Sequence, residues 1–452
     1  MKIADNEKMR QLMLSAPVGP LLFRKALPTV IIQLITVIYN TADTYFVAKI
    51  STSASAAVGI VFSLMSVIQA VGFGLGMGAG SIISRKLGAA DEDSANRYAS
   101  SAMAAGIGAG LLIMSLGLWQ LTSLMKLIGA RGNVLADACD YGFYILLAAP
   151  VMCMAFIFNN CLRAQGQTFL AMIGMTTGGI ANLFLDPVFI FGLRMGTDGA
   201  ALATMLSQIL SCLIMGFLFF SGRSIVKIRP RFVSRRIKVY RDIVRTGFPT
   251  IARQGLGSLA SAVLNIRAAA YGEAVIAAIT IANKLYMLVR YIILGIGQGY
   301  QPIAGYCYGA GKKERVRNLF CISTGAGTVI CTAAAVALYV FRVPVIAWFR
   351  NDPAVIECGA SMLRFLCLAM PLMAFSTYVN QTYQCLGYSV GATFLASCRQ
   401  GIFFMPLALL LPSAFGQTGI EMIQAWSDIL TFAISVPFMI WFYRKHLAAA
   451  AA

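Results

Sequence analysis

The chain repeats itself at a spacing of 221 residues. Pro28 recurs as Pro249, and Gly166 recurs as Gly387. Glycine and proline determine which backbone geometries a segment can adopt, so matched spacings predict two copies of one fold. Further matches include a row of alternate glycines, at 74, 76 and 78 and again at 295, 297 and 299, and the pair Pro150 and Pro371.

Both copies are apolar enough to lie in a membrane. Hydrophobic residues make up 59% of the 452 residues and charged residues 12%, whereas soluble proteins carry about 25% charged residues. A hydrocarbon core about 30 Å thick requires about 20 apolar residues per helix. Apolar runs between charged or Gly/Pro breaks predict twelve spans, near 27–47, 54–79, 98–122, 135–158, 168–193, 199–220, 247–271, 275–300, 318–341, 358–381, 389–411 and 420–442.

Six spans in each copy place the two halves in the membrane with the same orientation. We therefore predict an all-α integral membrane protein with twelve transmembrane helices in two six-helix lobes, related by a parallel pseudo-two-fold repeat. The N-lobe is expected at 15–221, a basic linker at 222–245 and the C-lobe at 246–447. Such a duplication predicts a substrate path between the lobes.

The net charge of +19 follows this topology. In the twelve-span arrangement, 24 of the 36 Lys and Arg residues fall on one side of the membrane. Positive charge accumulates on the cytoplasmic side, so both termini and the linker are expected in the cytoplasm of a multi-pass plasma-membrane protein. The basic excess therefore predicts contact with membrane lipids rather than binding of nucleic acid.

Several kinds of chemistry have no support in the sequence. The one histidine, His446, follows the last predicted span, and the eleven cysteines include no CxxC pair. No GxxxxGK[ST] phosphate loop is present. We expect a protein that is not an enzyme, has no cofactor or disulfide framework, and draws any pumping energy from an ion gradient.

Polar side chains gather at one depth in the first half. Asp43, Asp186 and Thr204 each lie about one to two turns from the same end of their spans, and Asn182 precedes Asp186 by one turn. Asp43 alone could be a helix-end carboxylate, and Asp186 alone could mark the kink before Pro187. Together, two carboxylates in low dielectric predict a shared proton or a Na⁺ ion bound by hard oxygen ligands.

The second half is basic where the first is acidic. Arg253, Lys284, Arg290 and Arg399 lie within its spans, and Asp428 is the only acid that we expect to be buried there. These cations either extend to the interface or pair with Asp428, or they form a cavity wall for an anionic group. The polar side chains that either line this cavity or join helices are Gln254, Gln298, Asn380, Gln381 and Gln384.

Several motifs carry a resemblance to a known family. The first span contains Pro28-Thr29-Val30 and YNTAD (39–43); GSIISRKLG (80–88) and RAQG (163–166) follow, and the second half has GQGYQPIAGY (297–306) before YGA (308–310). In this order they resemble the multidrug and toxic compound extrusion (MATE) family, over nearly the whole chain.

The resemblance implies cation-coupled export of organic, often cationic and amphipathic, compounds through a cavity between the lobes, by a protein of the bacterial inner membrane. It further implies a cation site at Asp43, Asn182, Asp186 and Thr204, with H⁺ or Na⁺ as coupling ion, and a bending proline at Pro28. One chain supplies both lobes, so a monomer is expected to suffice. We expect a substrate cavity lined by Tyr39, Asn40, Arg253, Gln254, Lys284, Gln298 and Asn380.

One departure and two rival functions accompany this hypothesis. A sodium-coupled subgroup of the family carries acidic ligands in its seventh and tenth helices, whereas the matching segments 249–257 and 380–387 contain no carboxylate. The basic residues of the second half favour a flippase for an anionic lipid-linked substrate. A membrane receptor or intramembrane enzyme is a further alternative, disfavoured by duplicated halves without catalytic motifs.

Overall fold

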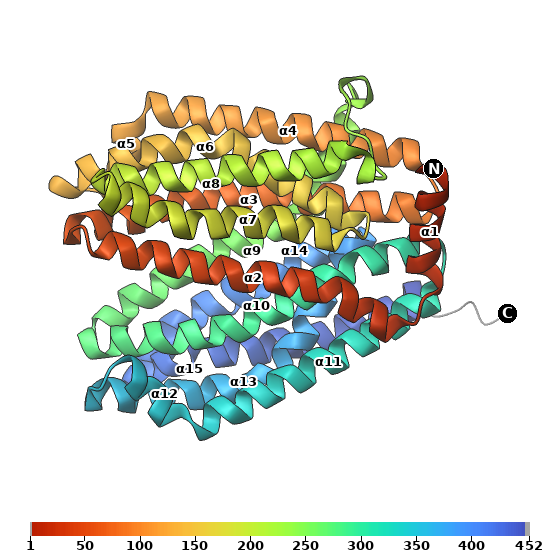
Figure 1. Ribbon diagram of the computed structural model, residues 1–452. Coiled ribbons are helices and arrows are strands. Elements are labelled where there is room, and N and C mark those ends of the chain that lie inside the picture. The colour runs from red at the N-terminus through yellow and green to blue at the C-terminus, as the bar shows by residue number, and fades with distance from the viewer. Residues whose placement is uncertain (1, 448–452) are drawn as a thin grey trace.

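The fold is built from two lobes of helices. The structure, a computed structural model, describes residues 2–447, and this part of the chain contains no strand. The N-lobe comprises α2 (Val18–Ala48), α3 (Thr52–Gly88), α4 (Glu92–Trp119), α6 (Asn133–Ala164), α7 (Thr168–Pro187) and α8 (Gly196–Leu218). The C-lobe comprises α9 (Ile237–Ala269), α10 (Glu273–Gly309), α11 (Lys313–Val340), α13 (Pro353–Leu386), α14 (Ser389–Ser397) and α15 (Phe404–Phe442). Figure 1 shows the two sets lying side by side.

These helices provide the twelve predicted spans. Ten described segments are long and apolar enough to cross a membrane, and one of them, Ser389–Leu447, has 59 residues. At 1.5 Å per residue that segment is far longer than one crossing requires. It folds back at Gly416, whose φ of 59° and ψ of −134° favour glycine, and thereby forms two spans. Helix α9 adds the remaining span; its first turns are basic, which lowers its mean hydropathy.

Short elements lie at the two ends of the bundle. Helix α1 (Lys2–Ser15) crosses the end where the N-terminus lies, and α5 (Leu121–Leu127) and α12 (Arg342–Phe349) lie at the opposite end (Figure 1). Helix α1 touches both lobes, because Arg10 donates to the carbonyl of Gly88 at 3.2 Å and Arg315 donates to that of Met13 at 3.2 Å. The sequence did not predict these elements, since none is long enough to span a membrane.

The linker is shorter than the predicted 222–245. Helix α9 begins at Ile237, so its first turns extend the span beyond the apolar run. The side chain of Gln165, at the end of α6, accepts hydrogen bonds from the amides of Ile225 and Val226 at 2.6 and 3.1 Å. The linker is therefore attached to the N-lobe.

All eleven cysteines are free, and all but Cys139 and Cys321 are buried. The buried cysteines pack as small side chains among the helices.

Glycines join the two lobes at the end that carries α1. A Cβ atom on Gly78 of α3 would lie 2.1 Å from the carbonyl oxygen of Ile243 in α9. A Cβ atom on Gly299 of α10 would lie 2.6 Å from the Cα atom of Ala26 in α2. Gly78 and Gly299 are repeat partners, so the α3–α9 and α2–α10 contacts are two copies of one packing arrangement. The parallel repeat is thus visible in contacts between atoms.

The lobes separate toward the other end. No atom outside the helix lies within 4 Å of a Cβ placed on Gly59 of α3, or on Gly255 or Gly257 of α9. Figure 1 shows α2 and α10 diverging toward the end that carries α5 and α12. The lobes are therefore in close contact at the end with α1, here called the closed end, and α2 and α10 lie farther apart at the opposite end, here called the open end.

Substitution of Gly78 by alanine tests the close packing of the lobes. Gly78→Ala should lower the melting temperature of the purified protein, because overpacking costs about 1–3 kcal/mol. Gly59→Ala, in the same helix, should not lower it, because its Cβ enters open space. A Gly78→Ala protein that melts no lower than the wild type would contradict this contact. Thermal unfolding in detergent measures both variants.

Candidate functional site

The polar site of the N-lobe begins with a stripe of residues on α7. Gly174, Gly178, Asn182 and Asp186 follow one another at four-residue intervals, so they lie on one face of the helix. The two glycines let α8 approach: a Cβ on Gly174 would lie 2.0 Å from the side chain of Met215. Such small residues allow close helix packing in membranes. The same face then carries Asn182 and Asp186 toward the open end.

Asn182 links the polar part of this face to α8. Its Nδ2 donates to Oδ1 of Asp186 at 3.1 Å and to Oγ1 of Thr204 at 3.4 Å. All three residues are buried, and Asp186 is 0% exposed. The structure therefore brings together three of the four residues that the sequence assigned to the cation site.

Helix α2 brings the fourth residue, Asp43. A Cβ on Gly179 of α7 would lie 2.9 Å from the ring of Tyr39, so α2 approaches α7 closely at this level. Asp43 follows Tyr39 by one turn, and its charge acts on Asp186. The two carboxylates thus occupy one region between α2 and α7.

Three oxygen atoms in this region have no hydrogen-bond partner. They are Oδ1 of Asp43, Oδ2 of Asp186 and the hydroxyl of Tyr141 in α6, which lies close to Thr204. Buried polar atoms are ordinarily satisfied in proteins, and the two carboxylate oxygens are able to accept a proton or a cation. Among residues 2–447 no group of three or more His, Cys, Asp or Glu side chains is placed to hold a metal ion.

Tyr141 is a site residue that the sequence reasoning missed. It is 0% exposed and is near both carboxylates. An uncharged tyrosine within an apolar run gives no signal of its own. Its depth, within the first turns of the predicted span at 135–158, is the only property that it shares with the other four residues.

Pro28 lies where α2 meets the other lobe. It is buried inside the helix, and the hydroxyl of the next residue, Thr29, donates to the carbonyl of Gly295 in α10 at 2.7 Å. Proline removes one backbone hydrogen bond and weakens a helix at its position. Pro28 is therefore placed where a change in α2 would alter the contact between the lobes.

A cavity that is open to its surroundings lies in the C-lobe. Residues of α9, α10, α13, α14, α15 and the π-helical turn η4 (Cys398–Ile402) line it. Its polar lining includes Arg253, Arg290, Arg399, Asn380 and Asp428. No N-lobe residue contributes to this lining.

Asp428 is fully engaged by its neighbours. Nε of Arg399 lies 2.6 Å from its Oδ1, and Nε2 of Gln424 donates to the same oxygen at 3.0 Å. The hydroxyl of Tyr286 donates to the other oxygen, Oδ2, and accepts from Arg399. The expected pairing of a C-lobe cation with Asp428 is thus present, and the partner is Arg399.

A second cavity lies between α3, α6 and α10. Arg163 of the N-lobe is buried there and donates to the side chains of Gln298 in the C-lobe and Asn160. This cavity belongs to the closed end, where Arg163 and Gln298 form a hydrogen bond between the lobes.

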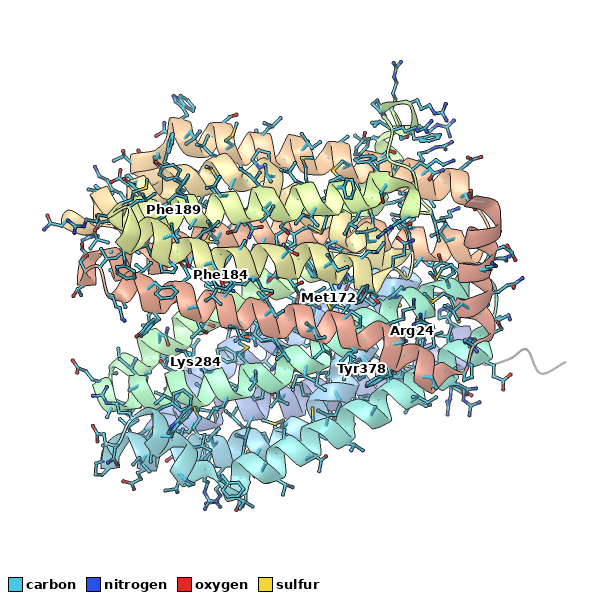
Figure 2. All side chains as sticks on the ribbon, in the orientation of Figure 1. Arg24, Met172, Phe184, Phe189, Lys284 and Tyr378 are labelled. Carbon is cyan, nitrogen blue, oxygen red and sulfur yellow. The ribbon has the colours of Figure 1, made fainter. Side chains whose placement is uncertain are left out.

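The residues that the sequence predicted to line one substrate cavity therefore lie in different places. Arg253 and Asn380 line the C-lobe cavity, and Gln298 lines the second cavity. Lys284 is exposed on α10 (Figure 2). It lines neither of these two cavities, and neither do Tyr39, Asn40 and Gln254.

One prediction about the C-lobe is wrong. Asp428 is not its only buried acid, because Glu421 is 3% exposed. Glu421 follows the turn at Gly416, and its carboxylate accepts from Gln417 and from Ser361 of α13. Glu421 lies near the start of the last apolar run, and α13 covers it.

Comparisons with known proteins agree over the whole chain. The family model MatE matches residues 28–188 and 249–410, one segment in each lobe. The multidrug export protein MepA of Staphylococcus aureus (strain MRSA252) is 27% identical over 438 residues, which cover 96% of this chain and 95% of MepA.

Solved structures match equally well. The crystal structure of MATE in complex with MaL6 has a TM-score of 0.91 at 26% identity, covering 96% of this chain and 98% of that chain. An outward-facing conformation of a multidrug resistance MATE family transporter of the MOP superfamily has a TM-score of 0.90 at 26% identity, covering 95% and 96%.

Removal of Asp428 tests the buried ion pair. Asp428→Asn should destabilise the protein by about 3–5 kcal/mol, because it leaves the Arg399 guanidinium buried without a counter-ion. The double variant Arg399→Gln/Asp428→Asn should recover much of that loss, and Glu357→Gln, an exposed carboxylate in the same lobe, should have little effect. Thermal unfolding in detergent gives the comparison. A double variant as unstable as Asp428→Asn would show that the two residues do not act as a pair.

Proposed function

The chain belongs to the MatE family of multidrug efflux transporters, and from this membership we propose that it is a cation-coupled secondary antiporter that exports organic, amphipathic compounds by alternating access. Members of this family are transporters rather than enzymes. The observation that carries the proposal is the pair of unpartnered carboxylate oxygens on Asp43 and Asp186. We further propose that the protein lies in the bacterial inner membrane and works as a monomer.

Orientation follows from the distribution of charge. The closed end carries α1 and the basic linker, and positive charge favours the cytoplasmic side. With both termini in the cytoplasm, the open end faces outward. In this state the N-lobe carboxylates can receive a cation from the external medium.

Cation binding drives the proposed cycle. Two nearby carboxylates in low dielectric repel each other, and an H⁺ or a Na⁺ ion removes that penalty. Neutralisation of Asp43 changes the balance of forces on α2, whose Pro28 segment touches α10. We expect α2 to rearrange there, releasing substrate and permitting the lobes to close outside and separate inside. The membrane potential contributes roughly 2.3 kcal/mol per charge per 100 mV.

The same donor set suits either coupling ion. Oxygen ligands from Asp43, Asp186, Asn182, Thr204 and Tyr141 suit Na⁺, and two adjacent carboxylates equally suit a shared proton. The C-lobe segments at 249–257 and 380–387 offer no carboxylate, so coupling is assigned to the N-lobe alone.

A flippase for an anionic lipid-linked substrate is the second candidate function. The arginines of the C-lobe cavity favour it. A panel of cationic dyes and anionic lipids, each tested for movement in liposomes, separates the two functions.

Asp43 and Asp186 are the residues on which coupling should depend. In proteoliposomes with an imposed H⁺ or Na⁺ gradient, Asp43→Asn and Asp186→Asn should each abolish gradient-driven export, since an amide needs no counter-ion. Asp93→Asn, an exposed carboxylate in the first turn of α4, is the matched control and should transport normally. Fluorescent-substrate efflux measures the rates, with the two gradients imposed separately. Full gradient-driven export by both site variants would refute the coupling role.

A further inference from the structure

The C-lobe cavity carries an excess of positive charge. Three guanidinium groups and one carboxylate line it. Asp428 is occupied by Arg399, as described above, which leaves Arg253 and Arg290 without an acidic partner among residues 2–447. The cavity is therefore cationic, whereas the cluster in the N-lobe is acidic.

Neither of these two arginines has a strong hydrogen bond. Nη1 of Arg290 donates only to the sulfur of Met287, at 3.6 Å, and Arg253 has no partner in the described chain. Arg253, Arg290 and Arg399 also lie close enough to repel one another. Each guanidinium has five N–H donors in a fixed planar arrangement. The cavity thus contains guanidinium donors, on Arg253 and Arg290, that no oxygen atom of the described chain accepts from.

Arg253 and Arg290 are not placed to extend their charged groups to the membrane surface. Arg253 lies at the middle of α9 and Arg290 close to the middle of α10, far from either helix end. Long cations near helix ends extend to the membrane surface, but these two point into a shared cavity. Ionisable residues within membrane spans ordinarily mark a ligand site or an ion path.

The rest of the lining selects the kind of ligand. Leu294, Met373 and Leu395 provide apolar wall, and Ser376, Thr377 and Asn380 provide further polar groups. An oxyanion fits the guanidinium donors, because carboxylate and phosphate groups accept two parallel hydrogen bonds from arginine. The apolar part of such a ligand would pack against the apolar side chains of the cavity wall.

We propose that the C-lobe cavity binds the oxyanion group of an amphipathic substrate, a carboxylate, sulfonate or phosphate, between Arg253 and Arg290. As a substrate site this rests on the proposed transport function, but binding itself requires no ion gradient. The repeat partners of the two arginines are Ile32 and Gln69, so the N-lobe has no equivalent site. The substrate therefore carries negative charge, in contrast to the cationic compounds that the family resemblance implied.

Equilibrium binding of charged fluorophores tests the site. The full-length protein in detergent is titrated with dansyl-undecanoate, an anionic amphiphile, and with dansyl-cadaverine, its cationic counterpart. Arg253→Gln and Arg290→Gln should each weaken dansyl-undecanoate binding by about tenfold or more, with a larger loss in the double variant. Lysine at either position should retain part of the affinity, because it keeps the charge but loses the bidentate geometry.

Two controls separate this site from general effects of charge and from coupling. Arg267→Gln removes an exposed arginine from α9, outside the cavity, and should bind like the wild type. Asp43→Asn should lose gradient-driven export yet still bind dansyl-undecanoate. A protein that binds the anion but shows no coupled transport would refute the antiport mechanism and leave the binding site standing.

The source of the oxyanion is tested in nanodiscs. If phosphatidylglycerol displaces dansyl-undecanoate from the wild type and phosphatidylcholine does not, a lipid headgroup is the source; if neither does, a free organic anion is. Both results support an oxyanion site. Unchanged dansyl-undecanoate binding in the double variant, or tighter binding of dansyl-cadaverine that the arginine variants do not affect, would overturn the proposal.

Discussion

The contact between glycines of α3 and α10 and the backbones of α9 and α2 holds the two lobes together. In a membrane the hydrophobic effect does not draw helices to one another, so close van der Waals contact must do so. Gly78 and Gly299 permit that contact because a side chain at either position would collide with the facing backbone. Contact between backbones also involves few side-chain rotamers. It can therefore be broken and remade without repacking a core, as the proposed alternating access would require.

Glycines also allow close helix contact within the N-lobe, and this contact positions the polar site. Gly174 and Gly178 bring α8 against α7, and Gly179 brings α2 against it. Asn182, Asp186 and Asp43 follow in the next turns. Polar groups are thus placed where helices are already close, so little water is needed to fill the space between them. This explains how oxygen atoms can be both buried and unpaired.

The sequence predicted the scaffold well because glycine, proline and charge carry strong physical signals. Repeat spacing gave two parallel lobes, and the cost of charge in a membrane drew attention to Asp43 and Asp186. The repeat also predicts that the partners of these acids are Leu264 and Leu407, and both pack in the apolar core of the C-lobe. Tyr141 gave no such signal, because an uncharged side chain costs little in an apolar helix. Nor could apolar runs reveal which helix covers Glu421, since that depends on packing between distant segments.

The two lobes therefore carry opposite unpaired charge on one scaffold. Two carboxylates in the N-lobe lack a counter-charge, and Arg253 and Arg290 in the C-lobe lack one as well. The two sets cannot neutralise each other directly, because each is enclosed by helices of its own lobe. In the proposed cycle, movement of the lobes changes how far water reaches each set, and the electrostatic cost of an unpaired group rises as the local dielectric falls. On the proposed function, the state of lowest energy is therefore one in which each lobe has its own counter-ion, and this requirement would connect ion binding in one lobe to substrate binding in the other without direct contact between the two.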